Sequence, residues 1–295
     1  MLTVTFIRHG QSTDNVRHVW AGWADAPLSQ RGSLTEALGA YFSQTLFTKI
    51  YASPLKRAAT TAAFILAAQP APQPPRDFTI ESVKEQNFGV AEGKPWCFPD
   101  NRIFKSLSEY ISEGKYPTPR PGECFTDGES DEDLAARAMR AVDEVIMPHV
   151  RSAVRAGHTE HIALVSHGIC IGALICALLK RDSSNVTPTR EYTGMQNTAW
   201  ARVVIKMQDV ADGTPIDLTD EGTHPLIVTV MDFGRADHLG KLVRPPKLNA
   251  GGTGKIAYDP KQRDIRAFFS GAVKTVATKH CESDSRDGID GETKN

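Results

Sequence analysis

The chain has 295 residues, enough to bury a sizeable core in one large domain or two small ones. Its net charge is −1, so the bulk charge points neither to nucleic acid nor to an anionic membrane surface as a partner. Five cysteines without metal-ligand spacing, no signal-like leader and no long apolar run predict a soluble protein of the cytosol, and of the nucleus as an alternative.

The predicted elements alternate between strand and helix. In the first half, the predicted strands are Thr3–Ile7 and Lys49–Ala52, and the predicted helices are Thr35–Phe47 and Pro54–Ala68. An extended segment follows at Asp77–Val83. In the second half, the predicted helices are Asp131–Ala156, which is interrupted by Pro148, and Gly168–Leu179. The predicted strands are His161–Ser166, Ala199–Lys206 and Leu226–Met231. This order predicts an α/β fold, a three-layer α/β/α sandwich with a mostly parallel central sheet.

Two segments depart from that alternation. Residues 95–123, here called the insertion, are rich in Pro and Gly around the helical stretch Asn101–Glu113, and we expect them to lie over a site as a lid. The pattern weakens after Arg235, so we expect a catalytic domain at residues 1–235 and a C-terminal extension at 236–295. A short helix at Asp264–Phe269 is predicted in that extension, with disorder over about its last 12 residues.

Histidine follows two apolar strands at the point where each strand ends. Arg8-His9-Gly10 comes directly after the first strand, and His167-Gly168 comes after Ile162–Ser166. Open α/β sheets bind ligands at the carboxyl ends of their strands, so neighbouring strands would bring the two imidazoles face to face. A lone histidine of this kind is usually a core residue, but two such corners in one chain favour a site.

Arg57 supplies a further cation near the same edge of the sheet. Ser53 and Pro54 follow a strand and are typical of a helix N-cap and first helical residue, which would place Arg57 in the first turn. Anions are favoured at a helix N-terminus. Arg8, His9, Arg57 and His167 therefore predict a phosphate cage with a nucleophile. We expect no cofactor and no metal; a metal site is the weaker interpretation, because two arginines would repel a divalent cation and the sequence shows no close pair of carboxylates.

A carboxyl group is needed beside this cage, since phosphoester cleavage requires an acid that protonates the departing alkoxide. Glu85 stands at the end of the extended segment, before a loop punctuated by Phe88-Gly89 and Glu92-Gly93. The like charge of a bound phosphate favours the protonated form of a neighbouring carboxyl group. Glu85 is the first candidate for the acid and Glu92 the second.

With these sites together, the chain resembles the histidine phosphatase superfamily, also called the phosphoglycerate-mutase-like family. The resemblance runs in order from residue 3 to about residue 206. It rests on Arg8-His9-Gly10 with Asn15, Gly22 to Ser29, Ser53 to Ala58, Glu85 to Gly93, Gly128-Glu129-Ser130, Ser166-His167-Gly168 and Asn197-Thr198.

The resemblance implies the family's fold and chemistry. His9 would be phosphorylated, His167 and the two arginines would hold the phosphoryl group, and Glu85 would act as acid and then as base. The phosphate pocket would be completed by Asn15, Gly22 and Gly168. Within the family, Val83 to Lys94 and the Gly-Glu-Ser element look most like the phosphatase branch that includes fructose-2,6-bisphosphatase and TIGAR-like proteins.

Two details bear on that assignment. Mutases of the family carry paired arginines in the insertion to hold a second phosphate, whereas this insertion has only the separated Arg102 and Arg120. Many phosphatases of the family carry glutamine where this chain has Ala21, so backbone amides or another residue must replace that side-chain contact.

The expected function is metal-independent hydrolysis of a phosphomonoester through a phosphohistidine on His9. The expected substrate is a small phosphorylated metabolite, either a sugar phosphate or a bisphosphate. The alternatives are a mutase-type phosphotransferase, a phosphoprotein phosphatase and a non-catalytic scaffold. The cations that could meet a second anionic group of the substrate are Lys94, Arg102, Lys105, Lys115 and Arg120. Neither nucleic acid nor a membrane is expected as a partner, and the oligomeric state is left open.

Overall fold

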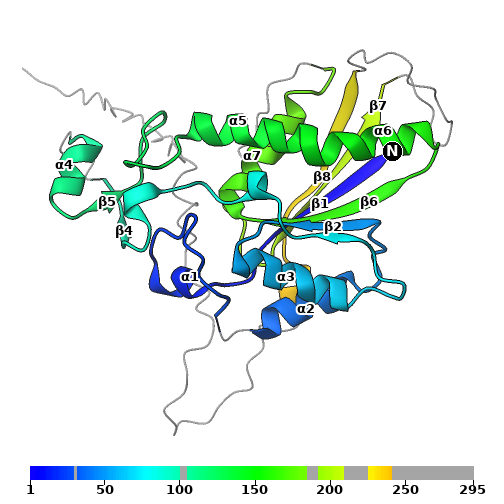
Figure 1. The fold of residues 1–295 in the computed structure, drawn as a ribbon, viewed down its shortest axis with the longest axis horizontal. Coiled ribbons are helices and arrows are strands. Elements are labelled where there is room, and N and C mark those ends of the chain that lie inside the picture. Colours follow the sequence, from blue (N-terminus) through cyan, green and yellow to red (C-terminus); the bar gives the residue numbers. More distant parts are fainter. Residues whose placement is uncertain (30–31, 100–104, 185–191, 209–224, 241–295) are drawn as a thin grey trace, which may run out of the picture.

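The fold is built on one six-stranded sheet, seen in a computed structural model that describes residues 1–29, 32–99, 105–184, 192–208 and 225–240 (Figure 1). The strand order is β3-β2-β6-β1-β7-β8. The strands are β1 (Leu2–Arg8), β2 (Lys49–Ala52), β3 (Arg76–Asp77), β6 (Glu160–Ser166), β7 (Trp200–Met207) and β8 (Leu226–Arg235). The first four of these are parallel, and β7 and β8 run antiparallel to their neighbours. The predicted mostly parallel α/β fold is confirmed.

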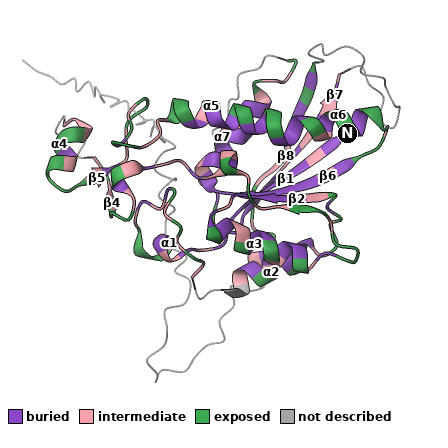
Figure 2. Ribbon diagram, viewed as in Figure 1, coloured by how far each residue is buried: buried purple, intermediate pink, exposed green. Residues whose placement is uncertain are grey.

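Helices cover both faces of the sheet, because its central strands are apolar on both sides. Successive side chains of a strand point to opposite faces. On β6, Ile162 and Leu164 join one hydrophobic cluster and Ala163 and Val165 join another. The first cluster includes side chains of α5 (Asp131–Ala141), α6 (Met147–Arg155) and α7 (Gly168–Leu179), and the second those of α2 (Gly32–Phe42) and α3 (Lys56–Ala67). Figure 2 shows the buried residues concentrated along the sheet and the helix faces that meet it.

Several predicted boundaries are wrong. Helix α2 ends at Phe42, and α3 begins two residues later than predicted, at Lys56. The extended segment Asp77–Val83 is a short strand, β3, followed by a 3₁₀ turn at Glu81–Val83. The long helix is three consecutive pieces, α5, a π-helical turn at Val142–Ile146 and α6. The π turn places Pro148 in the first turn of α6, where its missing N–H is tolerated.

The insertion packs against a small hydrophobic cluster formed by the neighbouring loops. It contains β4 (Trp96–Cys97), α4 (Leu107–Ser112) and β5 (Tyr116–Pro117), and β4 pairs with β5 in parallel. Trp20, which follows the short helix α1 (Thr13–Arg17), packs in a cluster with Phe88 and Phe125 against which Trp96, Leu107 and Tyr116 lie. The Trp20 indole N–H also donates to the carbonyl oxygen of Tyr116 at 3.0 Å. The insertion is therefore joined to the loops that follow β1 and Glu85.

The described part of the chain ends with a 3₁₀ turn at Asp237–Leu239, just after β8. The predicted helix at Asp264–Phe269 and the predicted disordered end both lie outside the described residues, as do the first positions of the predicted helical stretch in the insertion. Within the described ranges, no helix combines the length and the apolar character that crossing a membrane would require.

Candidate active site

The two histidines predicted from the strand ends lie together. Strands β1 and β6 are parallel neighbours with Arg8 opposite Ser166, and the backbone N–H of His9 donates to the carbonyl of Ser166 at 3.0 Å. The ring centroids of His9 and His167 are 5.0 Å apart, with the rings tilted by 56°. Both side chains are buried. The sheet topology therefore confirms the predicted juxtaposition of the two imidazoles.

The tautomer of His9 follows from its own backbone. Its Nδ1 lies 2.6 Å from the carbonyl oxygen of Gly10, and a carbonyl only accepts, so Nδ1 carries the hydrogen. In the neutral ring, Nε2 then keeps its lone pair. The amide of Asn197 donates to the carbonyls of His9 and Gly10 at 3.2 and 3.3 Å and to Oδ1 of Asn15 at 3.1 Å. Asn15 and Asn197 thus belong to one network that holds the backbone around His9.

His167 is oriented by a residue to which the sequence assigned another role. Its Nε2 lies 2.9 Å from the hydroxyl of Ser53, and both side chains are fully buried. The prediction that Ser53 caps the next helix is wrong, because α3 begins at Lys56 with Leu55 at its N-cap. Ser53 directly follows β2, which pairs with β6, so the strand-end reasoning that found the histidines could also have found this serine.

The two arginines of the predicted cage are both buried. Arg57, the second residue of α3, donates from its guanidinium to the carbonyls of Gly22 and Ala24 at 2.6 and 2.7 Å. Arg8 donates to the carbonyl of Met195. Burial lowers the pKa of the Arg57 guanidinium, and the charge of Glu85 is the strongest that opposes this shift. An arginine side chain remains protonated even when it is buried, so each guanidinium brings a positive charge into the site.

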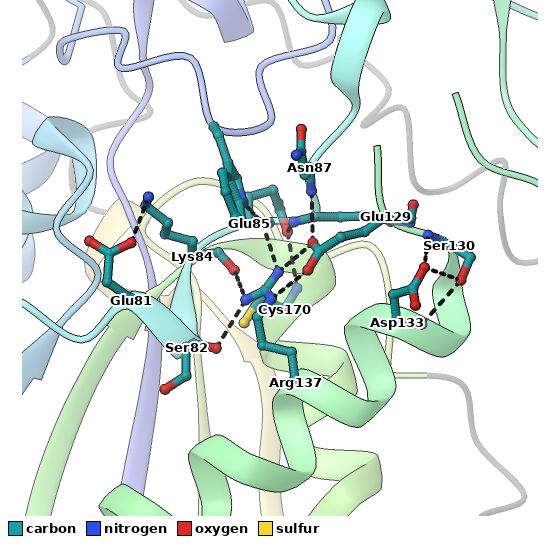
Figure 3. Close-up of polar contacts among 12 residues, drawn as sticks. Glu81, Ser82, Lys84, Glu85, Asn87, Glu129, Ser130, Asp133, Arg137 and Cys170 are labelled. Atoms are coloured by element: carbon teal, nitrogen blue, oxygen red, sulfur yellow. Dashed lines mark hydrogen bonds and ion pairs between the residues drawn. The ribbon is translucent and has the colours of Figure 1, made fainter. Parts of the chain in front are cut away.

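Glu85 meets the N-terminus of α7, the helix that begins at Gly168 directly after His167. Its Oε1 accepts the backbone N–H of Cys170 at 3.0 Å, and its Oε2 accepts that of Ile169 at 3.5 Å. The Glu85 side chain is buried, and its place beside α7 is visible in Figure 3. One helix start therefore carries His167 and receives the carboxyl group of Glu85.

Glu92, the second candidate for the acid, connects two loops through its carboxylate. Its Oε1 accepts the backbone N–H of Trp23 at 2.7 Å and that of Phe88 at 3.2 Å. These bonds tie the Gly22 loop, whose carbonyls receive Arg57, to the loop after Glu85. Ala21 immediately precedes Gly22 and contributes no polar side chain to this loop.

The described cations of the insertion form local ion pairs. Lys105 and Lys115 both contact the carboxylate of Glu113, and Arg120 lies 3.8 Å from Glu123. Lys94, which precedes the insertion, is exposed, and Arg102 lies outside the described residues. The side chains in the site thus comprise two imidazoles, two guanidiniums and one carboxyl group, a combination suited to nucleophilic phosphoryl transfer.

Known proteins are similar to this chain in sequence and in fold. The family model of the histidine phosphatase superfamily (branch 1) matches residues 4–210. The chain is 31% identical over 183 residues to the 2,3-bisphosphoglycerate-dependent phosphoglycerate mutase of Brucella canis, covering 60% of this chain and 81% of that one. The corresponding enzyme of Rhizobium etli is 29% identical over 200 residues, with 65% and 87% covered.

Solved structures agree on the fold. The phosphoserine phosphatase of Entamoeba histolytica superposes with a TM-score of 0.54 at 21% identity, covering 81% of this chain and all of that one. A mycobacterial glucosyl-3-phosphoglycerate phosphatase gives a TM-score of 0.54 at 20% identity, with 78% and 98% covered. The matched family model, the mutase relatives and the shared fold together show that this chain belongs to the histidine phosphatase superfamily, branch 1.

Proposed function

We propose that this protein is a phosphomonoester hydrolase that works through a phosphohistidine on His9, with a small phosphorylated metabolite as its substrate. The observation that carries the proposal is the hydrogen bond from Nδ1 of His9 to the carbonyl of Gly10. That bond fixes the ring and leaves Nε2 as the nucleophile. The centroid of the His9 ring lies 5.0 Å from that of His167.

The reaction has two steps. In the first, Nε2 of His9 attacks phosphorus in line, the P–O ester bond breaks, and Glu85 gives its proton to the leaving alkoxide. Arg8, Arg57 and His167 stabilise the charge on the equatorial oxygens, which is the main source of catalysis in phosphoryl transfer. In the second step, water attacks the phosphohistidine, Glu85 takes a proton from the water, and the P–N bond breaks to release inorganic phosphate.

The test of the nucleophile is direct. Brief incubation with a phosphorylated substrate should label the wild-type protein with phosphate that is lost in acid and kept in alkali. His9→Ala should show neither label nor turnover. Full turnover by His9→Ala would overturn the mechanism.

The acid role of Glu85 has a separate test that uses the leaving group. An alkoxide needs protonation as it departs, whereas a nitrophenolate hardly does. Glu85→Gln should therefore lose about 10²–10⁴-fold in kcat/KM, which reports the first step alone, on glycerol phosphate but little on p-nitrophenyl phosphate. Equal losses on both substrates would remove Glu85 from the acid role. The same reasoning predicts an activity optimum on the acidic side of neutral, because Glu85 must hold a proton when the substrate binds.

The second candidate is a phosphoglycerate mutase, a possibility raised by the 31% identity to the Brucella canis enzyme. A mutase returns the phosphoryl group to a second hydroxyl of its substrate. To do so, it must also bind another anionic group of that substrate. The ion pairs that Lys105, Lys115 and Arg120 already make favour hydrolysis, and with it the phosphatase branch suggested by the sequence. Product analysis with 3-phosphoglycerate separates the two, since release of inorganic phosphate without isomerisation supports hydrolysis. A panel of sugar bisphosphates and phosphoglycerates compared by kcat/KM would then identify the substrate.

A further inference from the structure

A buried ion pair lies directly behind Glu85, in the segment that carries the Gly-Glu-Ser element. Arg137 on α5 holds the carboxylate of Glu129 with two parallel bonds, Nε to Oε1 and Nη2 to Oε2, both 2.7 Å long (Figure 3). The side chains are only 8% and 17% exposed. Burial is the largest influence and opposes the charged form of Arg137, but the hydrogen bond to Glu129 and the neighbouring negative charges together raise the pKa of the guanidinium.

The remaining N–H groups of Arg137 bond to the main chain on the N-terminal side of the proposed acid. Nη1 donates to the carbonyls of Ser82 and Lys84, and Nη2 donates to the carbonyl of Glu85 itself, each at 2.9 Å. Together with the two bonds to Glu129, these contacts use all five N–H donors of the guanidinium. A single side chain therefore fixes the backbone from Ser82 to Glu85.

Glu129 holds the chain on the other side of Glu85. Its Oε2 accepts the backbone N–H of Asn87 at 2.9 Å, and its own N–H donates to the carbonyl of Asn87 at 2.8 Å. The side-chain amide of Gln86 donates to the carbonyl of Glu129 at 2.9 Å. The ion pair thus grips the residues before and after the acid, while the start of α7 receives its carboxyl group.

A role in stability alone does not account for this arrangement. A buried ion pair is often no more stabilising than apolar residues of the same size. Here, three of the five bonds of Arg137 end on main-chain carbonyls of the loop that ends in Glu85, and one of them ends on Glu85 itself. We propose that Arg137 and Glu129 are positioning residues that set the carboxyl group of Glu85 at the leaving group, an inference that rests on the proposed acid role of Glu85.

The leaving group tests this inference too, because a displaced acid harms only those reactions that need its proton. Arg137→Lys keeps the charge but loses the planar, two-bond geometry. It should lower kcat/KM on glycerol phosphate by about 10²-fold, the effect of a displacement of roughly 1 Å, and change kcat/KM on p-nitrophenyl phosphate by less than about threefold. Glu129→Gln should show the same selective loss. Arg181→Lys is the matched control, since Arg181 pairs with Asp143 on another part of the helical layer, and it should leave both activities unchanged.

Two further results decide the matter. In Glu85→Gln protein, adding Arg137→Lys should cause no further loss on glycerol phosphate, because the group that it positions is gone. Equal losses on both substrates for Arg137→Lys and Glu129→Gln, alongside a selective loss for Glu85→Gln, would overturn the positioning role and leave the acid role intact. If Arg137→Lys fails to fold, the selectivity of Glu129→Gln alone decides. An unselective Glu85→Gln would instead refute the acid role.

Discussion

Replacing Gly22 by alanine would test how the loop that receives Arg57 is held. The backbone of Gly22 has a φ of +43°, and a Cβ there would lie 2.0 Å from Oε1 and 2.7 Å from Cδ of Glu92. The same Oε1 accepts the N–H groups of Trp23 and Phe88. The Gly22 carbonyl accepts Nη2 of Arg57 at 2.6 Å, so a displaced loop would disturb the phosphate cage.

The expected loss of stability has two parts. A side chain at positive φ costs about 1–2 kcal/mol. The carboxylate of Glu92 must also move away from its two N–H donors, and buried hydrogen bonds to a charged group contribute about 1.5–3 kcal/mol each. Because Glu92 is partly exposed, water compensates part of this, and the total for Gly22→Ala should be about 3–5 kcal/mol.

Gly93→Ala is the matched control. Gly93 has a φ of +76°, but a Cβ at this position would meet no heavy atom within 4 Å, so alanine there bears the conformational cost of about 1–2 kcal/mol alone. Urea unfolding of both variants measures the difference. Binding of inorganic phosphate should also weaken in Gly22→Ala and not in Gly93→Ala. Losses that agree within about 0.5 kcal/mol would refute the reasoning that Glu92 is fixed beside Gly22.

Three further predictions concern buried polar groups. Ser53→Ala should lower kcat/KM about fivefold to tenfold, since one hydrogen bond to His167 contributes roughly 1 kcal/mol. Ser43→Ala, on an exposed turn, is the control. An unchanged kcat/KM in Ser53→Ala would exclude a role of Ser53 in orienting His167. His238→Leu should lower the free energy of unfolding by about 1–3 kcal/mol, because Nε2 bonds to the buried hydroxyl of Thr198 at 2.9 Å; no loss in urea unfolding would contradict this. Burial lowers the pKa of His161 and of His238 to about 4, so the unfolded chain binds more protons than the native state between pH 6.5 and 4. Stability is therefore complete above pH 6.5 and falls as the pH is lowered through this range, and a variant with His161→Gln and His238→Gln should show a shallower fall in denaturation measured against pH.

Local sequence patterns predicted much of the fold and the positions of the two histidines of the site. Helix α7 and strand β2 have the predicted bounds, because each is an apolar stretch ended by clear signals. His9 and His167 were found because the end of an apolar strand is visible in the sequence. The start of α3 was misplaced by two residues, because Ser-Pro satisfies the rules for a helix start, whereas Leu55, the observed N-cap, makes no side-chain cap hydrogen bond.

Other features depend on contacts between distant segments and left no local signal. Glu92 and Glu85 are both glutamates beside a glycine-punctuated loop, and the sequence cannot show that one accepts backbone N–H groups of the Gly22 loop while the other meets α7. The Arg137–Glu129 pair was visible only as a Gly-Glu-Ser element before a helix. Its five bonds appear when residues 82–87 and α5 are brought together.

The sequence by itself determined the alternation of strand and helix and the kinds of side chain that end each strand, because both depend on neighbouring residues and on the periodicity of apolar positions. The tertiary structure decided which strand ends meet. The order β2-β6-β1 brings Ser53, His167 and His9 to one edge, although more than 100 residues separate the first two. Side-chain orientation followed from that meeting, because each buried donor must find an acceptor and the available acceptors belong to other segments of the chain.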